Sequence, residues 1–475
     1  MFKNSSTECK LIAEAADLFF AELAKTEDFE LFVEFVHKKL DNWKTKIVQQ
    51  CIEKFDNQLR DEIPSSWTIV KRLPRKITCV FGNIQYSRTL FVDNFGRNRY
   101  PCDEILGIPY KKRFSDDAYK WLLKSVSEMS YGKTARNFYS MSGAKVSKMT
   151  IWKMVQNQAE LIRDFYKAPY GEQICVDSIC VESDGIFVAL QNPKRRKEAI
   201  SRYLYRQNHH KKSFEIKVAA TYAGKLKESV ARNRRVNVNL YATIGSGNEI
   251  MHAINNQIKN EYDTSYLKKI FYGTDGGSWC KNHQLEDISG HIQVNQALDG
   301  FHIMQAIWRV FPKGKVQDWL VYLMLRRKPE TAIRNLKRIN SRLHGATRQK
   351  ARELLTYLEN NVDLIKANFN LGTMEATNAH VWARRMKHIG GAWSKNGANS
   401  MALLLAHLHS GKKVITQPRN IFFSKADEVK KEKALQIITN ELHQKALDIY
   451  EADKGRINCQ RVKDLYFPSI ARYPE

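Results

Sequence analysis

Between residues 171 and 312, strand-like apolar runs alternate with segments of helical periodicity, and this order constrains the fold more than any other feature. NEIMHAINNQIKNEY repeats apolar residues at helical spacing, and HIQVNQALDGFHIMQAIWRVF is expected to be a strand that runs into a helix. The β-type runs are QICVDSICVESDGIFVAL, read as a hairpin or two strands, and FEIKVAATYAG, VNVNLYATIG and LKKIFYGTD. Strands that alternate with helices predict an α/β layer with a mixed sheet.

The rest of the chain divides into regions of different texture. Apolar residues at steps of three and four predict helices, and alternating runs predict short strands. The regions expected are 1–64 (helical), 65–112 (small and β-rich), 113–170 (helical), 171–312 (first part of the α/β core), 313–370 (a helical insertion), 371–412 (two helices interrupted at Gly390-Gly391) and 413–475 (a helical tail).

The chain is strongly basic, because 77 Lys and Arg against 50 Asp and Glu leave a formal charge of +27. Such an excess, gathered in patches such as 194–197 and 232–235, indicates a polyanionic partner, most directly nucleic acid. A basic protein that its charge keeps soluble is the alternative. The sequence shows no long apolar span and no signal-like N-terminal segment, so we expect no membrane insertion and a cytoplasmic location.

The segment SYGKTARNFYSMSGAKVSKMTIWKMVQNQ predicts a helix-turn-helix. A first helix near Tyr131–Met141 is followed by a turn that contains Gly143 and by a second helix capped by Ser147. In a DNA-reading motif, the second helix would present four polar side chains to a groove: Lys148, Thr150, Lys153 and Gln156. An ordinary helical hairpin has the same pattern, so both interpretations stay open.

Three acidic residues stand out by their context. Asp184 and Asp275 each follow a strand-like run and precede a glycine, and Glu375 opens a helical segment. Carboxylates can hold two divalent cations about 4 Å apart, an arrangement that promotes phosphodiester cleavage, and Mg²⁺ prefers oxygen ligands. Taken singly, the two aspartates could form turns, and Glu375 could stabilise the first turn of a helix. Spacing alone does not bring the three together.

Seven motifs of the chain, taken in order, carry a resemblance to a known family. In the amino-terminal half they are GNIQYSRTLF, YPCDEILGIP and SYGKTARNF; in the other half they are VESDGIFVALQ, GTDGGSW, LDGFH and GTMEATNAHVWARRMKHIGGAWSKNGANSMA. They resemble the ISLre-type insertion-sequence transposases, a bacterial family also catalogued as an uncharacterised protein family and distantly related to Mutator-like transposases. The resemblance covers most of the chain.

The resemblance implies a DDE-type recombinase with an RNase H-like core, in which a helical insertion precedes the final glutamate. By motif, the three acidic ligands fall on Asp184, Asp275 and Glu375, which would hold two Mg²⁺ ions, with Mn²⁺ as a substitute. A D-x-x-H element falls on Asp299 and His302. For His302, contact with DNA, support of the active site and a place in the core all remain open.

At the first acidic site the chain departs from the more acidic pattern usual in the family, because the sequence there is ESDGIF. Asp177, on the preceding strand-like run, competes with Asp184 as the first ligand. Trp279 and Trp393 could stack on splayed bases or pack in the core.

The sequence therefore predicts a DNA transposase that cuts at insertion-sequence ends and joins the freed 3'-hydroxyl to target DNA. Its partners would be double-stranded DNA of the terminal inverted repeats and of the target, and the synapsis of two ends favours a homo-oligomer that is nucleoid-associated when bound. After the final acid, Arg384, Arg385 and Lys387 could face the DNA backbone or form a solvated basic face. A non-enzymatic helix-turn-helix DNA-binding protein and an RNase H-like nuclease are the alternatives.

Overall fold

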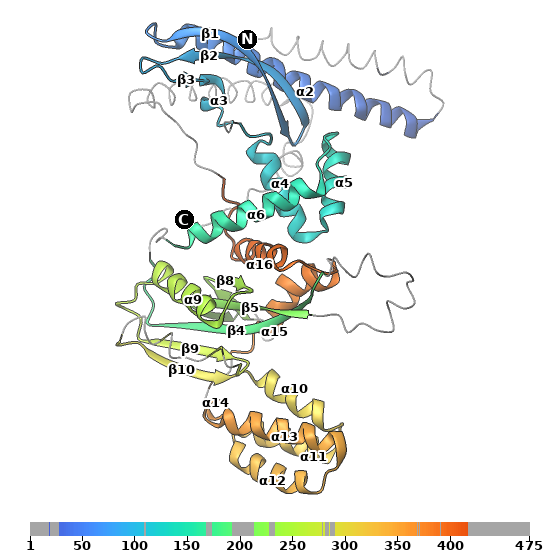
Figure 1. Cartoon of the computed structure of the whole chain (residues 1–475), viewed down its shortest axis with the longest axis vertical. Coiled ribbons are helices and arrows are strands. Elements are labelled where there is room, and N and C mark those ends of the chain that lie inside the picture. Colours follow the sequence, from blue (N-terminus) through green and yellow to red (C-terminus); the bar gives the residue numbers. More distant parts are fainter. Residues whose placement is uncertain are drawn as a thin grey trace, which may run out of the picture. The chain divides into compact units, whose positions relative to one another are not determined.

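The computed structural model describes most of the chain between residues 28 and 416 (Figure 1). The described residues are 28–108, 111–167, 173–191, 213–227, 233–277, 290–367, 371–389 and 391–416, with Phe19, Trp279, Cys280, Leu285 and Phe369. They belong to two compact units. The first holds residues up to 116 together with 142–144, and the second holds 117–141 and 145–416.

The first unit packs one long helix against a small sheet. Asp28 accepts hydrogen bonds from the backbone N–H groups of Glu30 and Leu31 and so caps the start of the helix. Ile77, Ile84 and Tyr86 form the buried core of the sheet. The elements are α2 (Phe29–Glu62), β1 (Thr68–Cys79), β2 (Gly82–Val92), β3 (Asn98–Arg99) and α3 (Pro101–Ile105), with the strands in the order β1-β2-β3. A helix and a hairpin thus occur where the two periodicities predict them.

The second unit is built around a mixed five-stranded sheet in the order β10-β9-β4-β5-β8. Its strands are β4 (Ser178–Ala189), β5 (Ser213–Tyr222), β8 (Asn239–Thr243), β9 (Lys269–Thr274) and β10 (Gln293–Leu298). β4, β5 and β8 pair antiparallel, whereas β9 lies parallel to both β4 and β10. The predicted α/β layer with a mixed sheet is confirmed. A separate two-stranded ribbon, β6 (Gly224–Lys227) and β7 (Asn233–Val236), lies between β5 and β8 in the chain.

One expectation about the strands was wrong. Within the run QICVDSICVESDGIFVAL, residues Ser178–Ala189 form the one long strand β4 and Ile174 makes only an isolated β-bridge with Tyr262, so the run is neither a hairpin nor two full strands. Its residues from Ile179 to Val188 are mostly buried on both faces of the sheet. A strand buried on both faces shows a continuous apolar run instead of a clean alternation, and its length alone does not reveal a turn.

Helices of the second unit cover the sheet and its β8 edge. α9 (Gly247–Glu261) contacts β5 and β8, and α16 (Lys395–His409) contacts β8. At that edge, the Leu240 N–H donates to Ser410 Oγ at 2.8 Å and the Ile244 N–H donates to Asn399 Oδ1 at 3.0 Å. Side chains on and just after α16 therefore satisfy backbone donors of a strand edge.

The predicted helix-turn-helix is present as a pair of helices. α4 (Asp116–Glu128) is followed by α5 (Tyr131–Ser142) and α6 (Lys148–Phe165). Gly143 has a φ of 68°, and Ser147 caps α6 by accepting from the Thr150 N–H. α6 packs on α16 and so belongs to the same compact unit as the sheet.

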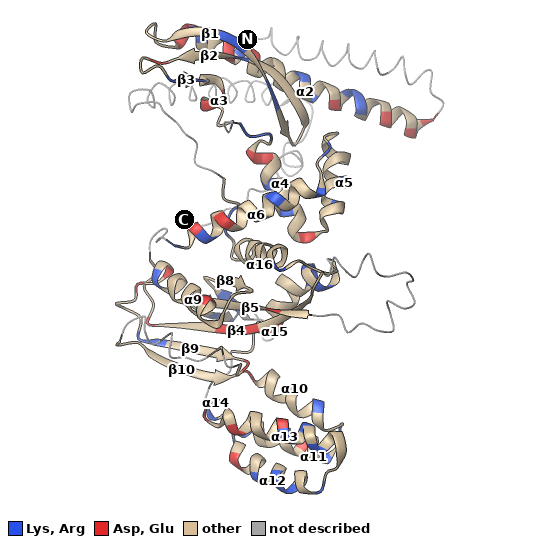
Figure 2. Ribbon diagram, viewed as in Figure 1, with Lys and Arg blue, Asp and Glu red and all other residues tan. Residues whose placement is uncertain are grey.

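A bundle of helices lies between β10 and the last part of the unit; it includes the predicted insertion 313–370 and begins earlier, at Gly300. α10 (Gly300–Val310), α11 (Lys315–Leu325), α12 (Pro329–Ser341), α13 (Gly345–Asn360) and α14 (Val362–Lys366) share one apolar core. The chain then forms α15 (Met374–Thr377), which continues into the π-helix η3 (Asn378–His388) before α16. Figure 2 shows Lys and Arg positions along several of these helices.

Several predicted features lie wholly or partly outside the described residues. They are residues 1–27 of the helical region 1–64 apart from Phe19, the basic patch 194–197, the first residue of the basic patch 232–235, Gly390 of the expected helix interruption and the tail from 417 onward. Within the described part of the chain, no helix has the length and apolar character needed to span a membrane.

Candidate active site

The register of the parallel strands brings two of the predicted acids side by side. The parallel pairing of β4 and β9 ends at Ser183 and Thr274. The residues that follow are Asp184 after Ser183 and Asp275 after Thr274. β10 pairs with the other side of β9 up to Leu298, which places Asp299 one step further on. Carboxyl ends of neighbouring strands are where open α/β sheets bind ligands. Asp184, Asp275 and Asp299 therefore lie side by side, each one residue beyond the last paired residues of β4, β9 and β10.

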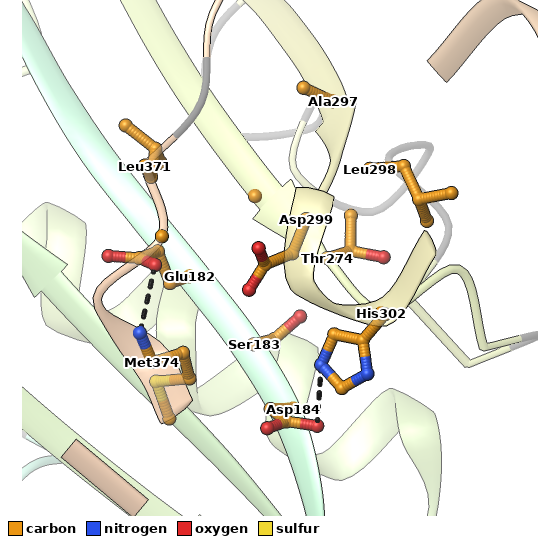
Figure 3. Close-up of a pocket in the computed structure, with 12 residues that line it drawn as sticks. Glu182, Ser183, Asp184, Thr274, Ala297, Leu298, Asp299, His302, Leu371 and Met374 are labelled. Carbon is orange, nitrogen blue, oxygen red and sulfur yellow. Dashed lines mark hydrogen bonds and ion pairs between the residues drawn. The ribbon is translucent and has the colours of Figure 1, made fainter. Parts of the chain in front are cut away.

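Asp184 lies in an enclosed, polar setting. It is 4% exposed, and its carboxylate accepts from the Gly185 N–H at 2.7 Å and from Asn378 Nδ2 at 2.5 Å. His302 Nε2 lies 3.6 Å from Asp184 Oδ1 (Figure 3). Burial raises the pKa of Asp184 to about 6; His302 opposes this rise, and the nearby charges of Asp275 and Glu375 add to it. The three predicted acids are thus close enough to act on one another electrostatically.

The raised pKa of Asp184 predicts a pH-dependent stability. The native carboxyl binds its proton more tightly than the unfolded one, whose ordinary pKa is 3.8, so the stabilisation it gives is present at low pH and lost as pH rises to about 6. In Mg²⁺-free buffer, the free energy of unfolding of the wild type relative to Asp184→Asn should fall by on the order of 1–3 kcal/mol between pH 4 and 7. Urea unfolding of both proteins measures this difference, and a difference that does not change with pH would contradict the assignment.

Asp275 sits in a tight loop after β9. One of its carboxylate oxygens accepts from the Gly277 N–H at 2.8 Å and lies 3.5 Å from Cys280 Sγ. Gly276 has a φ of 80°, and a Cβ there would come within 2.8 Å of Leu298 Cδ1. Both the backbone angle and the lack of space require glycine. The DGG sequence therefore forms a turn and also fixes the direction of the Asp275 carboxylate.

Glu375 completes the set from a different part of the chain. It is exposed near the start of α15, and it lines one groove together with Asp184 and Asp275. The groove has a volume of about 1010 Å³. Other polar and charged side chains that line it are His302, Gln305, Arg309, Lys350, Glu353, Tyr357, Asn378, Lys387 and His388. The groove thus combines an acidic cluster with a cationic border.

The donor chemistry of the groove fits hard divalent cations. Asp184, Asp275 and Glu375 supply only carboxylate oxygens, the ligand type that Mg²⁺ prefers, and their mutual repulsion favours a bound cation. Among the residues that the structure describes, no three His, Cys, Asp or Glu side chains form a complete site for a single ion. Mg²⁺ usually takes one or two protein carboxylates and fills its shell with water and substrate oxygens.

The D-x-x-H element supports the groove from α10. Asp299 is the N-cap of this helix and accepts from the Phe301 N–H at 3.0 Å. This cap fixes the start of α10, and His302 in its first turn contacts Asp184. Of the three roles left open for His302, the structure favours support of the acidic site.

Glu182 is a residue of this site that sequence reasoning missed as a functional group. It lies two residues before Asp184 on β4 and is 2% exposed. Its carboxylate accepts from the backbone N–H groups of Thr373 and Met374, the two residues before Glu375. Figure 3 shows the bond to Met374. Its place in the motif VESDG was visible in the sequence, but its partners lie about 190 residues away, so no local signal pointed to them.

Asp177, the competing first ligand, lies at the other end of the parallel pairing. Its backbone carbonyl accepts from the N–H groups of Lys268 and Lys269, next to Ser178, where β4 and β9 begin to pair. The pairing continues for six residue pairs before Asp184 and Asp275 are reached. The geometry therefore favours Asp184 over Asp177.

Burial contradicts the predicted DNA contact of Arg385 and, of the two roles left open for Trp393, favours packing in the core. Arg385 is 2% exposed; its Nε donates to the Val126 carbonyl, and its guanidinium lies 5.1 Å from the centre of the Trp393 ring. Trp393 is 6% exposed, and its Nε1 donates to the Met386 carbonyl at 2.9 Å, so it packs in the core. Arg384 and Lys387 are exposed, as a surface role requires.

Of the four residues of α6 expected to read DNA, two are exposed and two are not. Lys148 and Lys153 are exposed, whereas Thr150 is half-buried and close to Ser147. Gln156 accepts from Ser400 Oγ of α16 at 2.7 Å, so this side chain takes part in helix packing rather than facing a groove. Trp279 is half-buried beside Lys217, whose Nζ lies 5.8 Å from the ring centre.

Comparison with known proteins identifies relatives across most of the chain. A family model described as Uncharacterised protein family (UPF0236) matches residues 25–417. A UPF0236 protein from the vanSb 3' region of Streptococcus gallolyticus is 22% identical over 389 residues, which cover 77% of this chain and 80% of that protein. A UPF0236 protein of Caldanaerobacter subterraneus subsp. tengcongensis is 21% identical over 409 residues, 84% and 82% of the two chains.

One solved structure is also similar. It is a Drosophila P element transposase strand transfer complex, which is 8% identical and covers 61% of this chain and 78% of its own. The TM-score is 0.21, a value that carries no argument about fold or function.

Proposed function

The chain belongs to the Uncharacterised protein family (UPF0236), and from this premise we propose that it is a DDE-type DNA transposase. It would cleave DNA at the ends of an insertion sequence and join the freed 3'-hydroxyl to target DNA. The observation that carries the proposal is the groove in which Asp184, Asp275 and Glu375 meet, although they stem from two strands and a later helix.

An RNase H-like core is part of the same proposal. Its support is the mixed sheet, with the first acid on β4, the second directly after β9 and the third after the helical insertion α10–α14. This order of elements is the one that the resemblance to the ISLre-type transposases implies. The net charge of +27 supports a nucleic acid as the substrate.

The residues of the groove would have separate tasks in phosphoryl transfer. Asp184, Asp275 and Glu375 would hold two Mg²⁺ ions, which, when bound, activate the attacking oxygen and stabilise the leaving oxygen. Asn378 and His302 orient the Asp184 carboxylate by direct contact. A phosphoryl transfer needs little covalent help from the protein, so the positioning of these carboxylates would supply most of the catalysis.

The cations at the border of the groove would hold the DNA strand. Arg309, Lys350 and Lys387 line the same groove as the acids and can neutralise phosphates on either side of the scissile bond. The exposed Lys148 and Lys153 of α6 would contact DNA outside the groove. Since two DNA ends must meet for strand transfer, the active form is proposed to be a homo-oligomer.

A two-step DNA assay tests the proposed function. Purified protein is incubated with Mg²⁺ and duplex DNA that carries the terminal sequences flanking its own gene. Cleavage at the element ends and, with a pre-cut end, joining to a target plasmid are expected, and EDTA should abolish both. Binding without cleavage would favour the non-enzymatic DNA-binding protein, whereas cleavage without joined product would favour the nuclease.

Lys387 gives a prediction about the salt dependence of DNA binding. If this exposed side chain neutralises one phosphate, Lys387→Met should lower the slope of log K against log salt by about 1. Lys259→Met is the matched control, because Lys259 is an exposed lysine of α9 outside the groove lining. Fluorescence anisotropy between about 50 and 200 mM salt measures both slopes. Equal slopes for the two variants would remove Lys387 from the DNA path.

A further inference from the structure

Glu182 is surrounded by hydrogen-bond donors. Tyr222 Oη donates to its Oε1 at 2.7 Å, and the Thr373 hydroxyl donates to the same oxygen. The backbone N–H groups of Thr373 and Met374 donate to Oε2 at 2.9 and 3.2 Å. Each oxygen thus accepts two hydrogen bonds, from groups on β5 and on the segment that leads into α15.

This arrangement calls for an ionised carboxylate and leaves little room for a second role. A carboxylate has about four lone-pair sites and no donor, so four donors saturate it. Glu182 therefore lacks a free lone pair for a cation, although it shares a strand face with Asp184 two residues later. Glu182 thus lies next to the three acids of the groove but differs from them, because hydrogen bonds occupy both of its carboxylate oxygens.

The segment before Glu375 is held from the other side as well. Lys225 Nζ donates to the Leu371 carbonyl, and Arg235 Nη1 donates to Thr373 Oγ1 at 3.3 Å. Both cations belong to the β6–β7 ribbon. The Thr373 hydroxyl thus links the Arg235 guanidinium to the Glu182 carboxylate, and this opposite charge offsets part of the cost of burying Glu182.

We propose that Glu182 is a positioning residue that sets the place of Glu375. The start of a helix leaves backbone N–H groups without intrahelical partners, and a side-chain acceptor usually satisfies them. Here the Thr373 hydroxyl is turned toward Glu182, and the Glu182 carboxylate itself accepts from the Thr373 and Met374 N–H groups. The strand that carries Asp184 thereby fixes the first turn of the helix that carries Glu375. The role in catalysis rests on the proposed transposase function, whereas the positioning does not.

Glu182→Gln tests the proposal by two independent measurements. The amide of glutamine directs an N–H₂ group at donors, so the segment should lose its anchor. In Mg²⁺-free buffer, hydrogen exchange of the amides in 373–381 should become about tenfold faster, while amides of α12 and α13 keep their wild-type rates. The Mg²⁺ concentration for half-maximal cleavage should rise about tenfold, as is typical when an outer partner of a metal ligand is lost.

Three further variants sharpen the test. Thr373→Val removes only the hydroxyl link and should give the same two changes at about a third of the size, whereas Thr373→Ser should restore wild-type behaviour. Glu261→Gln is the matched control, since it neutralises a partly buried carboxylate paired with Lys412 in the same unit; both readouts should stay unchanged.

The outcomes separate this inference from the proposed function. Lost cleavage with wild-type exchange at 373–381 would overturn the positioning role and make Glu182 a direct participant. Wild-type values of both readouts in Glu182→Gln would also overturn it. If the wild type does not cleave DNA but Glu182→Gln still accelerates exchange at 373–381, the positioning stands and only the transposase proposal fails.

Discussion

Asp275→Asn is expected to lower the rate of Mg²⁺-dependent DNA cleavage by about 10³-fold or more. The amide keeps the size of the side chain and can still accept from the Gly277 N–H, but it removes the negative charge that the proposed cations need. Metal-ion catalysis contributes several kcal/mol to transition-state stabilisation, and each 1.36 kcal/mol corresponds to a factor of ten in rate. Single-turnover cleavage of a labelled element end measures the loss.

The folding and DNA affinity of Asp275→Asn should stay close to the wild-type values, because the substitution is nearly isosteric at a half-buried position. Asp164→Asn serves as the matched control, since Asp164 is an exposed aspartate of α6 paired with Lys167. That control should cleave at the wild-type rate. If Asp275→Asn cleaves as fast as Asp164→Asn, the enzyme proposal is wrong and the non-enzymatic alternative gains support.

Trp382→Ala is expected to give the largest loss of stability among single substitutions on the helix that carries Glu375. Trp382 is fully buried in η3, and its Nε1 donates to the Ala402 carbonyl of α16 at 3.0 Å. Truncation would leave a cavity and an unpaired carbonyl, so the free energy of unfolding should fall by about 3–5 kcal/mol. Urea unfolding followed by circular dichroism measures this change.

Trp308→Ala provides the matched comparison, because the Trp308 side chain on α10 is 50% exposed. A surface substitution of this kind should change the free energy of unfolding by about 0.5 kcal/mol or less. Trp382→Phe keeps most of the ring volume but loses the hydrogen bond. Its decrease in the free energy of unfolding should lie between those of Trp308→Ala and Trp382→Ala. Equal effects of Trp308→Ala and Trp382→Ala would contradict the packing of η3 on α16.

The sequence was sufficient to predict the acids of the groove but not their surroundings. Asp184, Asp275 and Glu375 stand in short motifs whose order carried the resemblance, and β9 and α9 follow from simple periodicity. Strand order and register depend on pairing between distant segments, and a single sequence does not reveal this pairing. For that reason only the register of β4 and β9 gives grounds to favour Asp184 over Asp177.

The error at Arg385 has a specific physical cause. The expectation for Arg385 rested on its charge and its place after Glu375, which do not reveal the face it occupies; residues Asn378–His388 form a π-helix, whose turns are wider than the 3.6 residues of an α-helix. In a π-helix, successive side chains therefore lie on different faces from those expected for an α-helix. Arg385 therefore points to Tyr131 and Trp393 in the interior, while its neighbour Arg384 stays exposed.

The hydrogen bonds from the β8 edge to Asn399 and Ser410 have a consequence for assembly. An unprotected edge strand recruits a strand from another chain and extends the sheet across the interface. At the β8 edge, the Leu240 and Ile244 N–H groups, which such a strand could use, are already engaged by side chains of the same molecule. A second copy that paired with β8 would have to displace these two side chains, so extension of the sheet across an interface is disfavoured at this edge.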